Sequence, residues 1–201
     1  MQYQIESEPV YFHILQGSPF LLTDERCKKK LLDLVFDQYH RLGWRSYAFC
    51  VTDSVIYMLS VTSGHSFKEE YLQRAADTFL SWNALQKNIY TGSSRYLRSR
   101  MIRTLSDMDT VVRYCCRIHQ IPLTEGYAEH MEDYWWSSYN TYLGSHVWSM
   151  IDCHAVFFYF SMNSVLARSR FRKFHNSVKI PILIKTELAD KNDAERILLN
   201  E

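Results

Sequence analysis

Two periods of apolar residues alternate along the first 105 residues, and their order constrains the fold more than any other feature of the sequence. Residues 10–15 alternate as in a strand and end at the turn signal 16–19. Residues 24–42 then carry apolar side chains at helical spacing. Residues 44–51 and 55–62 are β-branched and aromatic, and the short polar stretch between them predicts a hairpin. The chain therefore begins with the order strand, helix, strand, strand.

Capping residues support the limits of the helices. Thr23 or Asp24 is a suitable N-cap for the first helix, and Gly43 is a suitable end. Ser66 followed by Glu69 forms a capping box, which predicts a second helix to about residue 85.

The basic stretch 97–105 is compatible with one more strand, and Ser106-Asp107 can cap a helix through about residue 118. The completed order is the split β-α-β arrangement of ferredoxin-like folds, an α+β class with an antiparallel sheet of four or five strands and helices on one face. After Pro122 the pattern is mostly helical. We expect an α+β domain over residues 1–145 and, over 146–201, a helical C-terminal extension of the same domain.

Positive charge is concentrated in two segments although the net charge is only +1. Residues 84–106 and 153–186 contain no acidic residue. Their basic residues are Lys87, Arg95, Arg98, Arg100, Arg103, Arg168, Arg170, Arg172, Lys173, Lys179 and Lys185. Such segregation can give a basic face for nucleic acid on a neutral protein, or simply a solvated helix surface.

The cysteines predict reduced thiols. They are Cys27, Cys50, Cys115, Cys116 and Cys153, and no C-x-x-C pair occurs among them. Cys115 and Cys116 fall inside a predicted helix, where we interpret them as packing residues. The sequence has neither a signal peptide at its start nor an apolar run long enough for a bilayer, so we expect a cytoplasmic protein without a membrane partner.

The segments IHQIPLTEG and EDYWWSSYNTYLG carry the most specific pattern in the chain. They resemble the motifs YIHLNPVRAG and PEDYPWSSYRAYLG of REP-associated tyrosine transposases, and the weaker resemblance around them extends over about residues 9–200. The sequence departs from the first motif at Arg117, where the family has tyrosine, and at Ile121, where it has asparagine. The resemblance implies a transposase-like α+β domain.

The resemblance also implies a catalytic metal site, which this sequence lacks. Members of the family cut single-stranded DNA with a metal, Mg²⁺ or Mn²⁺, that two histidines hold on a central strand. Val55 and Tyr57 occupy the two histidine positions here, with Ile56 between them. Valine cannot bind a metal and phenol is a poor ligand for magnesium or manganese. We therefore expect no metal and no cofactor at this strand, with both side chains on one face of it.

The nucleophile of the family is a tyrosine in an Arg-Tyr pair. One alignment register places Arg100-Met101 there, and the other places Arg95-Tyr96. We prefer the first register, which loses the tyrosine and predicts that Met101 shares a cleft with residues 55 and 57. Tyr96 is the catalytic candidate if the second register holds.

Three functions remain open from the sequence. The first is binding of hairpin or single-stranded DNA without cleavage, in which exposed rings stack on bases and a set of basic residues contacts phosphates. That set is Arg95, Arg98, Arg100, Arg103, Arg170, Arg172 and Lys173. The second is an active transposase with Asp53 and His65 as metal ligands and Tyr96 as nucleophile. The third is a protein-binding scaffold. A homodimer is compatible with each.

The WWSSY block also has a purely structural interpretation. Trp135 and Trp136 are adjacent, so they point to different sides of any regular element and we expect one of them in the core. Ser137 and Ser138 are expected to cap a helix.

Overall fold

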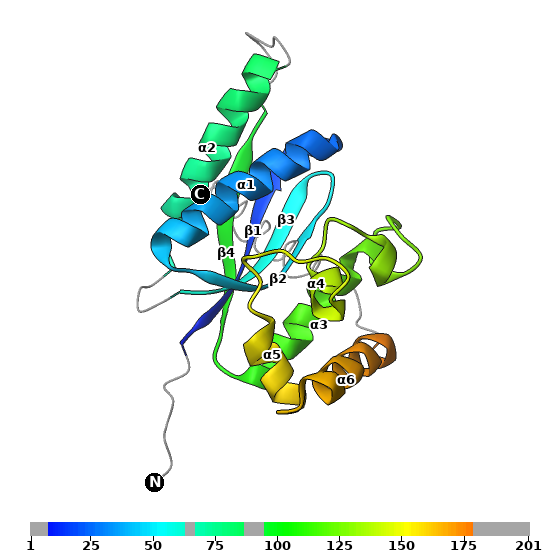
Figure 1. The fold of residues 1–201 in the computed structure, drawn as a ribbon. Coiled ribbons are helices and arrows are strands. Elements are labelled where there is room, and N and C mark those ends of the chain that lie inside the picture. The colour runs from blue at the N-terminus through cyan, green and yellow to red at the C-terminus, as the bar shows by residue number, and fades with distance from the viewer. Residues whose placement is uncertain (1–7, 63–66, 87–94, 179–201) are drawn as a thin grey trace, which may run out of the picture.

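The computed structural model describes residues 8–62, 67–86 and 95–178 (Figure 1). Within these residues one antiparallel sheet holds four strands in the order β2-β3-β1-β4. The strands are β1 (Val10–Gly17), β2 (Arg45–Val51), β3 (Val55–Val61) and β4 (Leu97–Leu105). The α+β, ferredoxin-like class predicted from the sequence is confirmed, and β3 and β1 are the central strands.

Three long helices and several short ones accompany the sheet. The long helices are α1 (Glu25–Leu42), α2 (Glu69–Gln86) and α3 (Met108–Thr124). The helical portion that follows contains η1 (Met131–Asp133), α4 (Tyr139–Leu143), α5 (Cys153–Phe160) and α6 (Ser164–Ser177). None of the described helices is long and apolar enough to pass through a bilayer.

Two of these helices, α1 and α3, begin at the predicted capping residues. The Asp24 side chain accepts a hydrogen bond from the backbone N–H of Arg26, and Gly43 ends α1 in the left-handed region at φ 65°. Asp107 caps α3 in the same way, by accepting from the N–H of Thr110.

The sheet is covered on both faces. Adjacent residues of a strand point to opposite faces. His13 of β1 contacts Tyr39 of α1 at 2.8 Å, from its Nε2 to the phenol oxygen. The neighbouring Phe12 packs on Tyr114 of α3, with 5.2 Å between ring centroids. The two helices of the ferredoxin-like unit, α1 and α2, therefore lie on one face, as expected, and α3 covers the other (Figure 1).

Three predicted boundaries were wrong. β1 continues through the expected turn to Gly17, because Gln16 and Gly17 pair with β4. α3 continues past residue 118 to Thr124, since Pro122 lies near the helix end and removes only one helical hydrogen bond. Glu69 is the first residue of α2 and not its third, so it cannot complete a capping box. Ser66 lies outside the described residues.

The outer edge of β2 is paired with the segment around the WWSSY block. The N–H of Val51 donates to the carbonyl of Trp136 at 2.8 Å, and the N–H of Ser138 donates to the carbonyl of Phe49 at 3.0 Å. The N–H of Phe49 donates to Ser138 Oγ at 2.9 Å. At the other end of the strand, Ser46 exchanges backbone hydrogen bonds with residues 150 and 152. The C-terminal portion is therefore attached to the sheet by its backbone.

The structure also decides the roles within that block. Trp136 is 9% exposed and Trp135 is 52% exposed, which confirms that one of the pair is in the core. Ser137 Oγ accepts from the N–H of Tyr139, the first residue of α4, but the N-cap position of this helix is Ser138. The Ser138 side chain makes no capping hydrogen bond. Its hydroxyl is instead hydrogen-bonded to the backbone of β2 and to the His119 ring.

Side chains of α2 cover the outer edge of β4. The Gln73 amide donates from Nε2 to the carbonyl of Leu97 at 3.0 Å and accepts from the N–H of Ser99 at 3.0 Å. Glu69 accepts from the N–H of Met101. These three contacts satisfy backbone groups that would otherwise face outward from the last strand.

We expect replacement of Ser138 by alanine to lower the free energy of unfolding by about 1–3 kcal/mol, because it leaves the buried N–H of Phe49 without its acceptor. Urea denaturation monitored by circular dichroism measures this change. Ser169→Ala, at an exposed serine of α6, is the matched control and should change stability by less than about 0.5 kcal/mol. Equal stabilities of the two variants would show that Ser138 does not hold the edge of β2.

Candidate nucleic-acid interface

Val55 and Tyr57 lie on the same face of a central strand. They pair with Gln16 and Ile14 of β1, on the face that α3 covers. Their side chains are 8% and 4% exposed. The strand that the sequence aligns with the histidine motif is thus in the expected place, but its two side chains are buried in packing contacts.

The neighbours of Tyr57 do not form a site for magnesium or manganese. Burial raises the pKa of the Tyr57 phenol, and the nearby Glu125 carboxylate raises that pKa further, so the phenol stays protonated. Cys50 faces Tyr57 from β2 and is also buried. Among the described residues, the single group of three or more histidine, cysteine or acidic side chains that could hold a metal lies elsewhere. The residues on β3 do not fit the metal that the family resemblance implies.

A buried cation is located at the tip of the β2–β3 hairpin. Lys28 of α1 has a side chain only 7% exposed, and its Nζ lies 3.1 Å from a carboxylate oxygen of Asp53. The same Nζ lies 5.8 Å from the ring centroid of Tyr127 and 5.9 Å from that of Tyr134. Asp53, the alternative metal ligand, is therefore already paired with a cation. His65, the other alternative ligand, lies outside the described residues.

Sequence reasoning did not find Lys28, Tyr127 or Tyr134. Lys28 belongs to a run of three lysines that reads as a solvated helix face. Only the tertiary contact with the hairpin shows that this lysine is buried.

Arginines of β4 gather on the face of the sheet that carries Tyr57. Arg98 and Arg100 pair with Gln16 and Ile14, the same two residues of β1 that pair with Val55 and Tyr57. After a bulge in the register, Arg103 pairs with Phe12 and returns to this face. Its Nη1 donates to the hydroxyl of Tyr114 at 3.3 Å.

The alternation of side chains along β4 separates the two nucleophile candidates. Met101 pairs with His13, so it lies on the α1 side of the sheet, opposite to Tyr57. The expected cleft shared by Met101 and residues 55 and 57 is therefore not formed. Tyr96 is 42% exposed just before β4, and the Arg98 guanidinium lies 6.0 Å from its ring centroid. Tyr96 thus lies beside the arginines of β4.

The remaining basic candidates are spread over other surfaces. Arg95 donates to Asn83 of α2 at 3.3 Å. On α6, Arg170 donates to the carbonyl of Phe160 at 2.8 Å, and Arg172 pairs with Glu132 at 2.8 Å. Lys173 lies on the same helix, which is well separated from β4 in Figure 1. Lys87, Lys179 and Lys185 lie outside the described residues.

Comparison with known proteins agrees with this architecture. No protein-family model and no curated protein matches the chain. Among solved structures, the chain is similar to one described as "Structure of the REP associates tyrosine transposase bound to a REP hairpin", with a TM-score of 0.50 and 11% sequence identity. The similarity covers 76% of this chain and 95% of that chain. The chain shares the fold of a REP-associated tyrosine transposase.

We expect no divalent metal to bind at β3, although the family resembled by the sequence uses one there. Crystals soaked in manganese should show no anomalous density beside Val55 and Tyr57, because neither side chain offers a ligand. An occupied site with ligands from β3 would contradict this prediction.

Proposed function

We propose that the protein binds hairpin or single-stranded DNA through the face of β4 and does not cut it. The observation that carries this proposal is the common face of Tyr96, Arg98, Arg100 and Arg103, which we call the β4 surface. The same face of the sheet at β3, where a transposase of this fold would hold its metal, carries the buried side chains of Val55 and Tyr57.

The chemistry of the β4 surface suits unpaired nucleotides. Guanidinium groups make charge-assisted hydrogen bonds to phosphate oxygens, often two at a time. An exposed aromatic ring offers a platform on which any base can stack. Arg98 lies beside Tyr96, so the phosphate and the base of a single nucleotide could contact both side chains. The Tyr114 hydroxyl orients Arg103 by accepting a hydrogen bond from it.

The choice of a hairpin rests on the structural similarity. The transposase with the same fold was solved with a REP hairpin bound. A hairpin offers phosphates along its stem and unpaired bases in its loop, which are the two features that the β4 surface would contact.

Cleavage with Tyr96 as nucleophile is the second candidate function. The observation in its favour is that Tyr96 extends from the same side of the sheet as Val55 and Tyr57. Incubation of labelled hairpin and single-stranded DNA with the protein and Mn²⁺ tests it. Nicking by the wild type that is lost in Tyr96→Phe would establish cleavage and overturn the binding-only proposal.

Replacement of both Arg98 and Arg100 by alanine should weaken DNA binding and reduce its dependence on salt. For a single strand, each phosphate that the variant no longer neutralises should flatten the slope of log affinity against log salt by roughly 0.7. Fluorescence anisotropy of a labelled hairpin at several salt concentrations measures both effects.

Arg26→Ala with Arg41→Ala is the matched control for that experiment. It removes the same charge from α1, on the other side of the sheet, where each arginine pairs with a nearby aspartate. The control should retain the wild-type slope. Absence of wild-type binding at low salt would contradict the DNA proposal and favour a protein-binding scaffold.

Tyr96→Ala should weaken binding to single-stranded DNA by about 1–3 kcal/mol if one base stacks on the ring, which is roughly 5- to 150-fold in the dissociation constant. Tyr96→Phe keeps the ring and should bind like the wild type. Equal losses in the two variants would show that the hydroxyl matters and not the stacking surface.

A further inference from the structure

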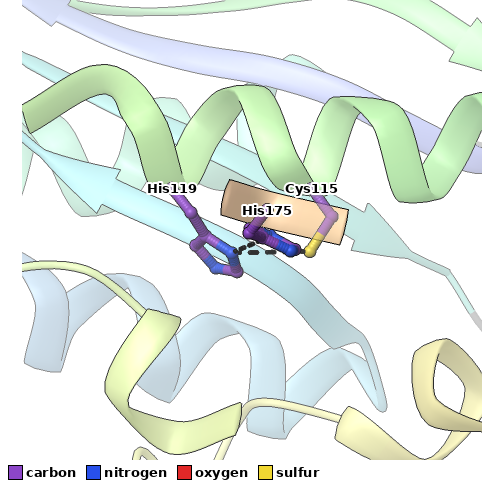
Figure 2. A group of neighbouring side chains, drawn as sticks. All are labelled: Cys115, His119 and His175. Carbon is purple, nitrogen blue, oxygen red and sulfur yellow. Dashed lines mark hydrogen bonds between the residues drawn. The ribbon is translucent and has the colours of Figure 1, made fainter. Parts of the chain in front are cut away.

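Three buried side chains that the DNA proposal does not use meet between α3 and α6. Cys115 and His119 are one helical turn apart on α3, and His175 approaches them from α6 (Figure 2). His119 Nδ1 lies 3.0 Å from His175 Nε2 and 3.8 Å from Cys115 Sγ. These three ligand atoms all lie within 4.8 Å of one another.

The other ring nitrogen of each histidine has a partner. His175 Nδ1 lies 2.9 Å from the carbonyl oxygen of Phe171, which can only accept, so this nitrogen carries the proton. His175 Nε2 therefore presents a lone pair to the cluster. His119 Nε2 lies 2.7 Å from Ser138 Oγ. Metal-binding histidines commonly have such outer contacts, because these fix the tautomer and the ring orientation.

We propose that Cys115 Sγ, His119 Nδ1 and His175 Nε2 bind a structural zinc ion. Thiolate and imidazole are the ligands that zinc prefers. Tetrahedral zinc with bonds of about 2.0–2.1 Å to nitrogen and 2.3 Å to sulfur separates two nitrogens by roughly 3.3 Å and nitrogen from sulfur by roughly 3.6 Å. The observed 3.0 Å between the two nitrogens and 3.8 Å between His119 Nδ1 and Cys115 Sγ each differ from these values by a few tenths of an ångström. The third pair of ligand atoms, Cys115 Sγ and His175 Nε2, lies within 4.8 Å.

Tyr142 lies beside Cys115 and His119. Its hydroxyl donates to the carbonyl of Tyr47 at 2.6 Å and also lies within hydrogen-bonding range of the Cys115 thiol. Structural zinc takes a fourth ligand besides these three side chains.

Zinc binding requires a defined rearrangement of protons, and the surroundings accommodate it. The Cys115 thiol loses its proton to solvent as the sulfur–zinc bond forms. The His119 proton must reside on Nε2 and point at Ser138 Oγ, so that Nδ1 can bind the metal. Ser138 can then donate its own hydroxyl proton to the carbonyl of Phe49, which lies 3.3 Å away.

The alternative is a chain of hydrogen bonds without metal. In it the Ser138 hydroxyl donates to His119 Nε2, His119 Nδ1 donates to His175 Nε2, and His175 Nδ1 donates to Phe171. This chain satisfies both rings, and the Cys115 thiol is not a link in it. Zinc instead uses all three side chains and links α6 to α3.

The test uses untagged full-length protein, because a polyhistidine tag binds zinc itself. Purified wild type should contain one zinc ion per chain by plasma mass spectrometry. Replacement of zinc by cobalt should produce a thiolate-to-cobalt charge-transfer band. Cys115→Ser should lose the band and the bound metal, whereas Cys116→Ser, at the neighbouring buried thiol, should keep both.

Thermal unfolding gives a second measurement, and its wild-type arm does not depend on the variants. A strong chelator should lower the melting temperature of the wild type and of Cys116→Ser but not that of Cys115→Ser. Wild type that purifies without zinc, yields no cobalt band and melts at the same temperature with and without added zinc would overturn the proposal in favour of the metal-free chain. These three results come from the wild type alone, so they decide the question even if Cys115→Ser fails to fold.

Discussion

The structure depends on satisfying the backbone groups at the outer edge of β2. An unpaired edge strand exposes alternate N–H and carbonyl groups, and leaving such groups buried without partners costs free energy. Here the segment from Trp136 to Asp152 supplies the partners, through its own backbone and through Ser138. The Ser138 hydroxyl also contacts His119 of α3. The edge of the sheet, α3 and the helical C-terminal portion are consequently parts of one connected core.

The sequence predicted those features that depend on near neighbours in the chain. Periodicity and caps located both central strands and the ends of α1, since Asp24 and Gly43 act through local backbone geometry. The spacing of Val55 and Tyr57 placed them correctly on one face of β3. The side of Met101 was wrong, because adjacent residues of a strand face opposite sides and Met101 follows Arg100, which shares the face of Tyr57.

The burial of Lys28 and the meeting of His175 with Cys115 were beyond sequence reasoning for a different reason. Each joins residues distant in the chain, and no local pattern marks the contact. The i, i+4 spacing of Cys115 and His119 was the one available signal, and it specifies only half of a cluster. The structure also separates the basic residues that sequence grouped together, since the arginines of α6 are engaged by Phe160 and Glu132.

The contacts of Gln73 with β4 limit how two copies of this chain could associate. Its primary amide offers one donor and one acceptor side by side, as a peptide unit of a fifth strand would, and Glu69 accepts from the next outward N–H. β2 is paired with its own C-terminal segment, and α2 covers the outer edge of β4 from Leu97 to Met101, so much of both edges of the described sheet is already occupied. Continuous sheets across two molecules, and the fibrous aggregation that begins with them, are disfavoured by this architecture.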